Sequence, residues 1–141
     1  MVSGHTAAAV AWRMVRSYRE LRVWQLGMDL VTDSYRLAEH LPKSEAYGLA
    51  AQIRRAAVSI PANIAEGHGR EHLREYLQHL SIAYGSLVEL ETHMLIAERL
   101  GHTERSETES LLERTARLGR MLNALTRGLR TLPRRRRTPD T

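Results

Sequence analysis

The sequence contains no cysteine and no phenylalanine, and Lys43 is its only lysine. The lack of cysteine excludes disulfide bonds, thiolate nucleophiles and cysteine metal ligands. Only 5% of the residues are aromatic, so leucine and alanine must fill the core. No apolar run approaches the roughly 20 residues that span a bilayer. We therefore expect a soluble, cytoplasmic protein with no membrane segment and no cofactor.

Arginine is the residue in excess. Lysine and arginine number 21 against 16 aspartates and glutamates, for a formal net charge of +5 and a pI near 10.2. The length of 141 residues suits one domain, and 43% hydrophobic residues indicate a globular chain. The positive charge favours an anionic partner, although arginine enrichment also follows from a GC-rich genome. Composition alone leaves nucleic-acid binding open.

Apolar residues recur at steps of three and four in four segments, at about residues 18–41, 44–67, 70–101 and 103–132. Ser44 and Thr103 are candidate N-caps, and Pro42 and Pro133 are stop signals. Gly67 and Gly69 should break the second helix. The last segment follows a strict heptad pattern. The spacing predicts an all-α, up-and-down four-helix bundle at residues 18–132, with a flexible or partly helical extension at 1–17 and a basic disordered tail at 133–141.

Two features go beyond a plain bundle. Pro61 lies inside the second helix, where it removes one backbone donor and should kink the helix. Apolar residues on the first and third helices spread beyond one narrow stripe, which is more than a small monomeric bundle needs. We therefore expect a homo-oligomer, assembled as a ring.

Polar residues accompany the apolar positions of the second and third helices. We expect a structural polar network that fixes the register of the two helices, formed by Arg55, Ser59, Asn63, Glu66, Ser86 and Glu89. The alternative is a catalytic carboxylate set of Glu66, Glu89 and Glu91, but the chain has no nucleophile elbow and no phosphate-binding glycine loop. We therefore expect no enzymatic activity.

A metal site is a further alternative. His68, His72, Glu75 and His79 follow one another at spacings of four, three and four, which a helix would align on one side. His68, however, lies within the glycine break at residues 67–69. We therefore predict no metal site.

Three basic groups are the candidate nucleic-acid contacts: Arg54 with Arg55, Arg70 with Arg74, and the tail residues Arg134, Arg135, Arg136 and Arg137. Each guanidinium can form a bidentate pair of hydrogen bonds with a phosphate. Alternatively, Arg74 pairs with Glu71 or Glu75, and the polar network holds Arg55. The sequence leaves both interpretations open.

Residues 52–67, QIRRAAVSIPANIAEG, followed by Arg70, closely resemble the signature of the bacterial four-helix-bundle proteins called 23S rRNA intervening-sequence proteins. Residues 21–25, LRVWQ, look like the opening motif of that family, and residues 80–92, LSIAYGSLVELET, look like its third-helix motif. The resemblance covers residues 18–130 and leaves Met14 as a candidate start.

The resemblance implies a homopentamer and a relationship to the accessory variability determinant of diversity-generating retroelements, a basic bundle that works with a reverse transcriptase and its template RNA. Our leading hypothesis is a non-enzymatic, oligomeric bundle that binds RNA or a nucleoprotein partner through arginine–phosphate contacts. The alternative is a homo-oligomeric protein-interaction scaffold for which nucleic acid is incidental.

Overall fold

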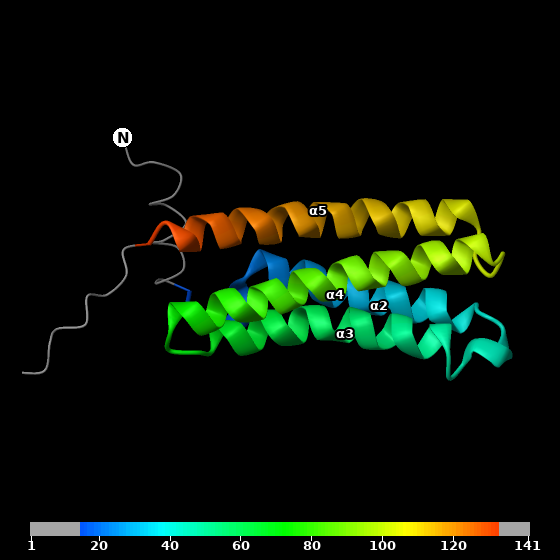
Figure 1. Cartoon of the computed structure of the whole chain (residues 1–141), viewed down its shortest axis with the longest axis horizontal. Coiled ribbons are helices and arrows are strands. Elements are labelled where there is room, and N and C mark those ends of the chain that lie inside the picture. Colours follow the sequence, from blue (N-terminus) through cyan, green and yellow to red (C-terminus); the bar gives the residue numbers. More distant parts are fainter. Residues whose placement is uncertain (1–14, 133–141) are drawn as a thin grey trace, which may run out of the picture.

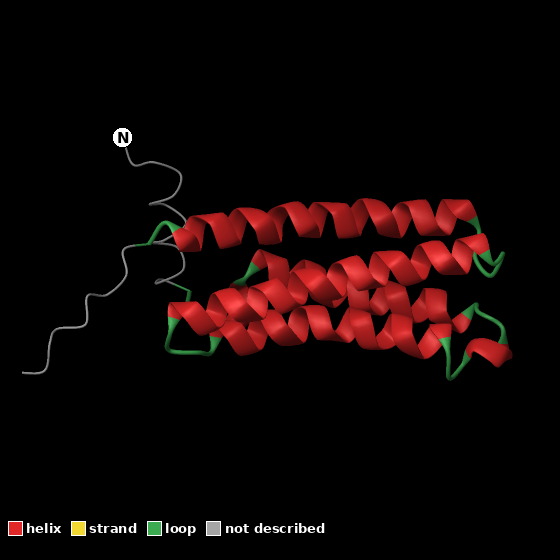
Figure 2. Ribbon diagram, viewed as in Figure 1, coloured by secondary structure: helices red, strands yellow, loops and turns green. Residues whose placement is uncertain are grey.

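The computed structural model describes residues 15–132, so the predictions made for residues 1–14 and 133–141 lie outside the described part of the chain. Two short 3-10 turns and four α-helices follow one another: η1 (Tyr18–Glu20), α2 (Arg22–Glu39), η2 (Lys43–Glu45), α3 (Leu49–His68), α4 (Leu73–Arg99) and α5 (Arg105–Arg130). No strand occurs within the described residues (Figure 2). The predicted all-α four-helix bundle is confirmed.

The four helices run up and down beside one another (Figure 1). Both α3 and α5 pack against α2 and α4, which places α2 and α4 at diagonal corners of the bundle. Most of the predicted heptad residues at the C-terminal end are buried, among them Leu118, Leu122 and Leu129, whereas Leu125 and Leu132 are partly buried. The core also contains fully buried side chains from the other helices: Leu30, Ile53, Ile60, Ile64, Tyr76, Leu80, Leu87, Leu90 and Met94.

Two predicted helix starts are wrong. Ser44 lies in the turn η2 and not at a helix N-cap, and α3 begins five residues later at Leu49, whose amide donates to Glu45 Oε2 at 3.0 Å. Thr103 likewise precedes the N-cap of α5, and its hydroxyl lies 3.2 Å from the Thr108 hydroxyl. In both cases a side chain near the predicted cap makes a different local hydrogen bond, so the helix starts later than the capping pattern suggests.

Of the two glycines predicted to break the second helix, Gly69 is the C-cap of α3, as predicted. The break at Gly67 is wrong, because α3 continues through Pro61 and Gly67 to His68. Gly67 is buried where α3 crosses α4, and a Cβ built on it would lie 2.6 Å from His79 Cβ. Such a distance is shorter than any van der Waals contact, so only glycine permits this crossing. The glycine acts through packing and not as a helix terminator. The kink at Pro61 stays a prediction.

The connection between α4 and α5 is a tight helix-ending turn. Gly101 has a φ of 76°, the amide of Gly101 donates to Glu98 O, and the amide of His102 donates to Ala97 O, both at 2.9 Å. This pair of bonds satisfies the last carbonyls of α4, and glycine adopts the left-handed conformation without a steric cost.

Several large apolar side chains remain on the surface of the bundle. Met28 and Tyr35 of α2, Val58 of α3 and Ile82, Tyr84, Val88, Leu95, Ile96 and Leu100 of α4 are exposed. None of the helices in the described range is both long enough and apolar enough to cross a bilayer.

Candidate nucleic-acid interface

The basic residues selected from the sequence do not form one patch. Arg54 and Arg55 lie in the second turn of α3, whereas Arg70 and Arg74 flank the connection between α3 and α4. The fourteen helical steps from Arg54 to His68 span about 21 Å at the α-helical rise of 1.5 Å per residue. Arg134, Arg135, Arg136 and Arg137 lie outside the described residues. The predicted contacts therefore divide between opposite halves of the bundle.

The four described arginines have different surroundings. The Arg54 guanidinium carbon lies 5.7 Å from the centre of the Tyr35 ring, a cation–π contact. Arg70 Nη2 donates to Glu66 Oε1 at 2.9 Å. Between residues 15 and 132, Arg55 and Arg74 make no ion pair, so Arg74 does not pair with Glu71 or Glu75. Both guanidinium groups are available to a phosphate.

The up-and-down topology brings arginines from four segments to one end of the bundle, where α2 and α4 begin and α3 and α5 end (Figure 1). We call this the arginine end, and its members are Arg16, Arg19, Arg22, Arg70, Arg74, Arg127 and Arg130. The half of the bundle that contains it, residues 15–30, 59–86 and 118–132, has eight arginines and five carboxylates. Arg16, Arg19, Arg22 and Arg127 were not sequence candidates, although the predicted topology places them beside Arg70.

The opposite end carries the reverse charge. The remaining half, residues 31–58 and 87–117, has eight basic residues and ten carboxylates. Many of these carboxylates have cationic or histidine neighbours: Arg105 Nε lies 2.8 Å from Glu109, His40 Nδ1 lies 3.6 Å from Glu107, and His102 Nε2 lies 3.7 Å from Glu45. We call this the acidic end. It is poorly suited to a phosphate backbone because its carboxylates repel phosphate.

A chain of polar contacts links α3 to α4 beneath the arginine end. Ser59 Oγ lies 2.8 Å from Ser86 Oγ, and Asn63 Nδ2 donates to Ser59 O at 2.8 Å and to Ser59 Oγ at 3.0 Å. Asn63 Oδ1 can only accept, so His79 Nδ1 donates to it at 3.1 Å. His79 Nε2 then lies 4.0 Å from Glu66 Oε1, the partner of Arg70.

This chain contains four of the six residues predicted as a network: Ser59, Asn63, Glu66 and Ser86. Arg55 is exposed and stands apart from it, and Glu89 instead pairs with His93 on its own helix at 3.2 Å. His79 is the member that sequence reasoning missed. Its spacing had placed it with a metal pattern, whereas its position opposite Asn63 depends on the register of two helices.

The histidine pattern does not converge. His68 packs edge-on against Tyr76, with 5.9 Å between the ring centres, while His79 is bonded to Asn63. Burial lowers the pKa of His68, and the nearby Glu20 carboxylate partly opposes that shift. In the described part of the chain, no three side chains of the metal-binding types are grouped to hold an ion.

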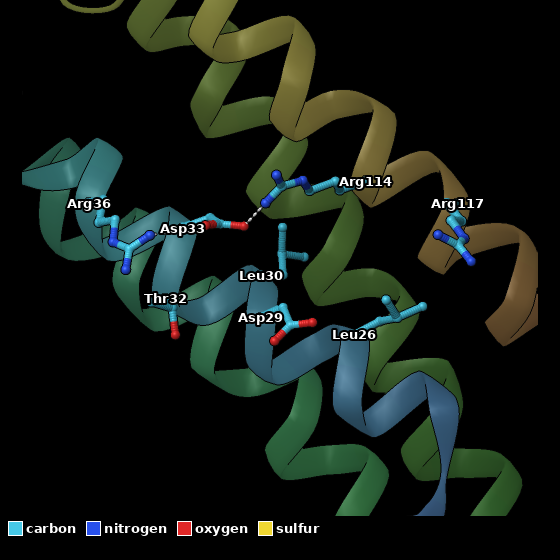
Figure 3. A pocket seen from close by; sticks show the side chains of 8 residues that line it. All are labelled: Leu26, Asp29, Leu30, Thr32, Asp33, Arg36, Arg114 and Arg117. Atoms are coloured by element: carbon cyan, nitrogen blue, oxygen red, sulfur yellow. Dashed lines mark hydrogen bonds and ion pairs between the residues drawn. The ribbon is translucent and has the colours of Figure 1, made fainter.

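A shallow groove of about 470 Å³ runs between α2 and α5 (Figure 3). Asp29 and Asp33 lie on its α2 side, and Arg114 and Arg117 lie on its α5 side. Arg114 bonds to Asp33 across the groove, and Arg36 lies 3.9 Å from the same carboxylate. The Arg114–Asp33 ion pair connects α5 to α2, which pack against each other less extensively than the other neighbouring helices. Asp29 and Arg117, which also line the groove, make no ion pair within residues 15–132.

The fold and surface define an all-α four-helix bundle with one arginine-rich end. The sequence model of the 23S rRNA-intervening sequence proteins matches residues 19–124, and the chain belongs to this family. No curated protein matches the chain. A crystal structure of a protein of unknown function from the S23 ribosomal protein family of Bacteroides thetaiotaomicron VPI-5482 has the same fold, with a TM-score of 0.70 and 21% identity over 74% of this chain and 97% of that one.

Proposed function

We propose that this protein is a non-enzymatic, homo-oligomeric bundle that binds RNA through arginine–phosphate contacts at the arginine end. The observation that carries the proposal is the separation of charge along the bundle, with arginines from four segments gathered at one end. Arg134 to Arg137 follow the last residue of α5 after three intervening residues in the sequence, and we propose them as further phosphate contacts. Phosphate contacts of this kind position a nucleic acid without reading its bases.

The resemblance to the intervening-sequence family supports a homopentamer, in which several arginine ends would act together. Such an assembly presents several arginine clusters to one RNA, and the second contact then forms at a high effective concentration. A nucleoprotein partner, such as a reverse transcriptase with its template RNA, would use the same phosphate contacts. Arg54 and Arg55 would form a separate, weaker patch because they lie in the acidic half.

Binding of a structured RNA across a salt series tests this proposal. If about six phosphates are neutralised, we expect affinity to fall roughly a thousandfold between 50 and 200 mM salt. Replacing Arg70 and Arg74 with alanine should reduce the salt slope by about two. The matched pair Arg99→Ala and Arg105→Ala, at the acidic end, should leave it unchanged.

The same experiment has clear negative results. Equal losses from the Arg70/Arg74 and Arg99/Arg105 pairs would show non-specific dependence on net charge and would contradict a role for the arginine end. A larger loss from Arg54→Ala with Arg55→Ala would move the interface to α3.

A protein-interaction scaffold is the second candidate. It is favoured by the exposed apolar side chains on α2 and α4, which a phosphate backbone would not cover. An oligomer with no measurable RNA affinity at low salt would support the scaffold over the RNA-binding function.

A further inference from the structure

The outward surface of α4 differs from that of the other helices. Between residues 78 and 96 its exposed residues include five large apolar side chains, and Glu89 is the only charged residue among them. We call these five residues, Ile82, Tyr84, Val88, Leu95 and Ile96, the α4 face. The exposed positions of α5 at residues 106–127 are instead mostly charged and include no large apolar side chain. The α4 face therefore has the composition of a surface that is covered.

A second apolar surface lies beside α3. It consists of the exposed residues Met28, Tyr35 and Val58 with the half-buried Trp24 and Val31, and we call it the α2–α3 patch. The two surfaces are on different sides of the molecule. Tyr35 lies under Arg54 of α3, whereas a Cβ at Gly119 of α5 would lie 3.6 Å from the Tyr84 ring.

We infer that the α4 face of one copy packs against the α2–α3 patch of a second copy. A head-to-tail contact of this kind uses two different surfaces of each chain, and when it closes into a ring it leaves neither exposed. The inference rests on the homo-oligomer of the proposed function and names its contact surfaces.

The spacing of the two surfaces fits helix–helix packing. Trp24, Met28, Val31 and Tyr35 follow one another at four, three and four residues, and Tyr84, Val88 and Leu95 follow one another at four and seven residues. Matched heptad spacing allows two helices to interlock over several turns. Gly85 lies within the α4 face, and a Cβ built there would meet nothing within 4 Å.

The exposed apolar area is sufficient for a stable contact. The exposed fractions of the α4 face amount to roughly 400 Å², and those of the α2–α3 patch to roughly 300 Å², if a large side chain offers about 200 Å². A specific interface needs about 1,000 Å² in total, of which about 60% is apolar. The two surfaces together exceed that apolar requirement of about 600 Å².

Cysteine cross-linking tests the contact directly, because the natural chain has no cysteine. Val88→Cys and Met28→Cys chains of different tagged mass, co-expressed and equilibrated in a glutathione buffer, should form a mixed disulfide. Each variant alone should form little disulfide-linked dimer. Ser110→Cys, on the exposed side of α5, is the matched control and should cross-link with neither partner.

The mass of the oligomer provides a second test, which does not require the two introduced cysteines to reach disulfide-bonding distance. Val88→Glu with Leu95→Glu should reduce the mass measured by light scattering to that of a monomer, with an unchanged circular dichroism spectrum because both positions are exposed. Ser110→Glu should retain the wild-type mass.

Three results would overturn the inference. Strong cross-linking of Val88→Cys with itself would show that two α4 faces pair symmetrically. A glutamate double variant that keeps the wild-type mass would show that the oligomer uses other surfaces and would leave the proposed oligomeric function intact. A wild-type chain that is monomeric at every concentration would overturn both the contact and the homo-oligomer.

Discussion

The two ends of the bundle are held together by different means. Under the arginine end, α3 and α4 cross at a buried glycine and share a chain of hydrogen bonds from Ser86 to His79, whose Nε2 lies 4.0 Å from Glu66 Oε1. At the acidic end, Thr115 Oγ1 of α5 donates to Glu91 Oε2 of α4 at 2.9 Å, and the exposed pair of His40 with Glu107 joins the end of α2 to α5. The α3–α4 contact is thus fixed by close packing and a chain of partly buried hydrogen bonds, and the acidic end by one partly buried hydrogen bond and by surface pairs of low individual strength.

The two ends also differ in how far their charged side chains are paired. At the acidic end, Glu109 pairs with Arg105, and Asp33 pairs with Arg36 and Arg114. Arg74 and other cations of the arginine end, in contrast, have no partner within residues 15–132. A rigid support under uncompensated charge is the arrangement that a phosphate-binding surface needs, because little ordering is required on binding. The crossing of α3 and α4 at Gly67 is therefore the first feature to change in a test of how the two ends differ.

Gly67→Ala should have the largest effect on stability. The added methyl would meet His79 Cβ at 2.6 Å, and relieving that contact requires the two helices to separate. We expect a loss of about 2 kcal/mol in the free energy of unfolding, measured by urea denaturation. Gly85→Ala, where the methyl meets nothing, should instead gain a few tenths to about 1 kcal/mol from helix propensity. A Gly67→Ala protein as stable as the wild type would show that the crossing is not tight.

Removing one polar side chain at each end should reduce stability by a smaller amount, and by different amounts at the two ends. Asn63→Ala deletes three hydrogen bonds at the half-buried α3–α4 contact, and we expect it to cost about 1 kcal/mol after the better helix propensity of alanine is included. His40→Ala deletes an exposed pair at the acidic end and should change stability by less than about 0.5 kcal/mol. Equal losses in urea titrations of the two variants would remove the distinction between the ends.

Hydrophobic spacing was sufficient to predict the four helices of this bundle. Most heptad positions of α5 and the core positions of α3, such as Ile53 and Ile60, are buried as predicted. The apolar period of an amphipathic helix does not depend on where the helix begins or ends. The ends were less predictable. Ser44 and Gly67 have the residue types of a cap and a break, but the local bonds of Glu45 and the packing against His79 decide their roles.

The candidate site was predictable only in part, for a related reason. Arg70 and Arg74 were evident from the sequence, but their grouping with Arg19 and Arg127 depends on which helix ends meet in space. The same limit applies to the network, in which Asn63 and Glu66 were expected and His79 was not. A residue sixteen positions away becomes a neighbour only through the register of two helices.

The pH dependence of stability gives the smallest and most local test of the comparison. Burial lowers the pKa of His68 at the arginine end, so the unfolded chain binds a proton more readily than the folded chain between that lowered pKa and 6.5. The contribution of His68 is therefore present above pH 6.5 and is lost as the pH falls through this range. His68→Gln should show a smaller loss of stability between pH 7.5 and 5.5 than the wild type. A wild-type protein and a His68→Gln variant with the same pH profile in urea titrations would show that Glu20 cancels the effect of burial.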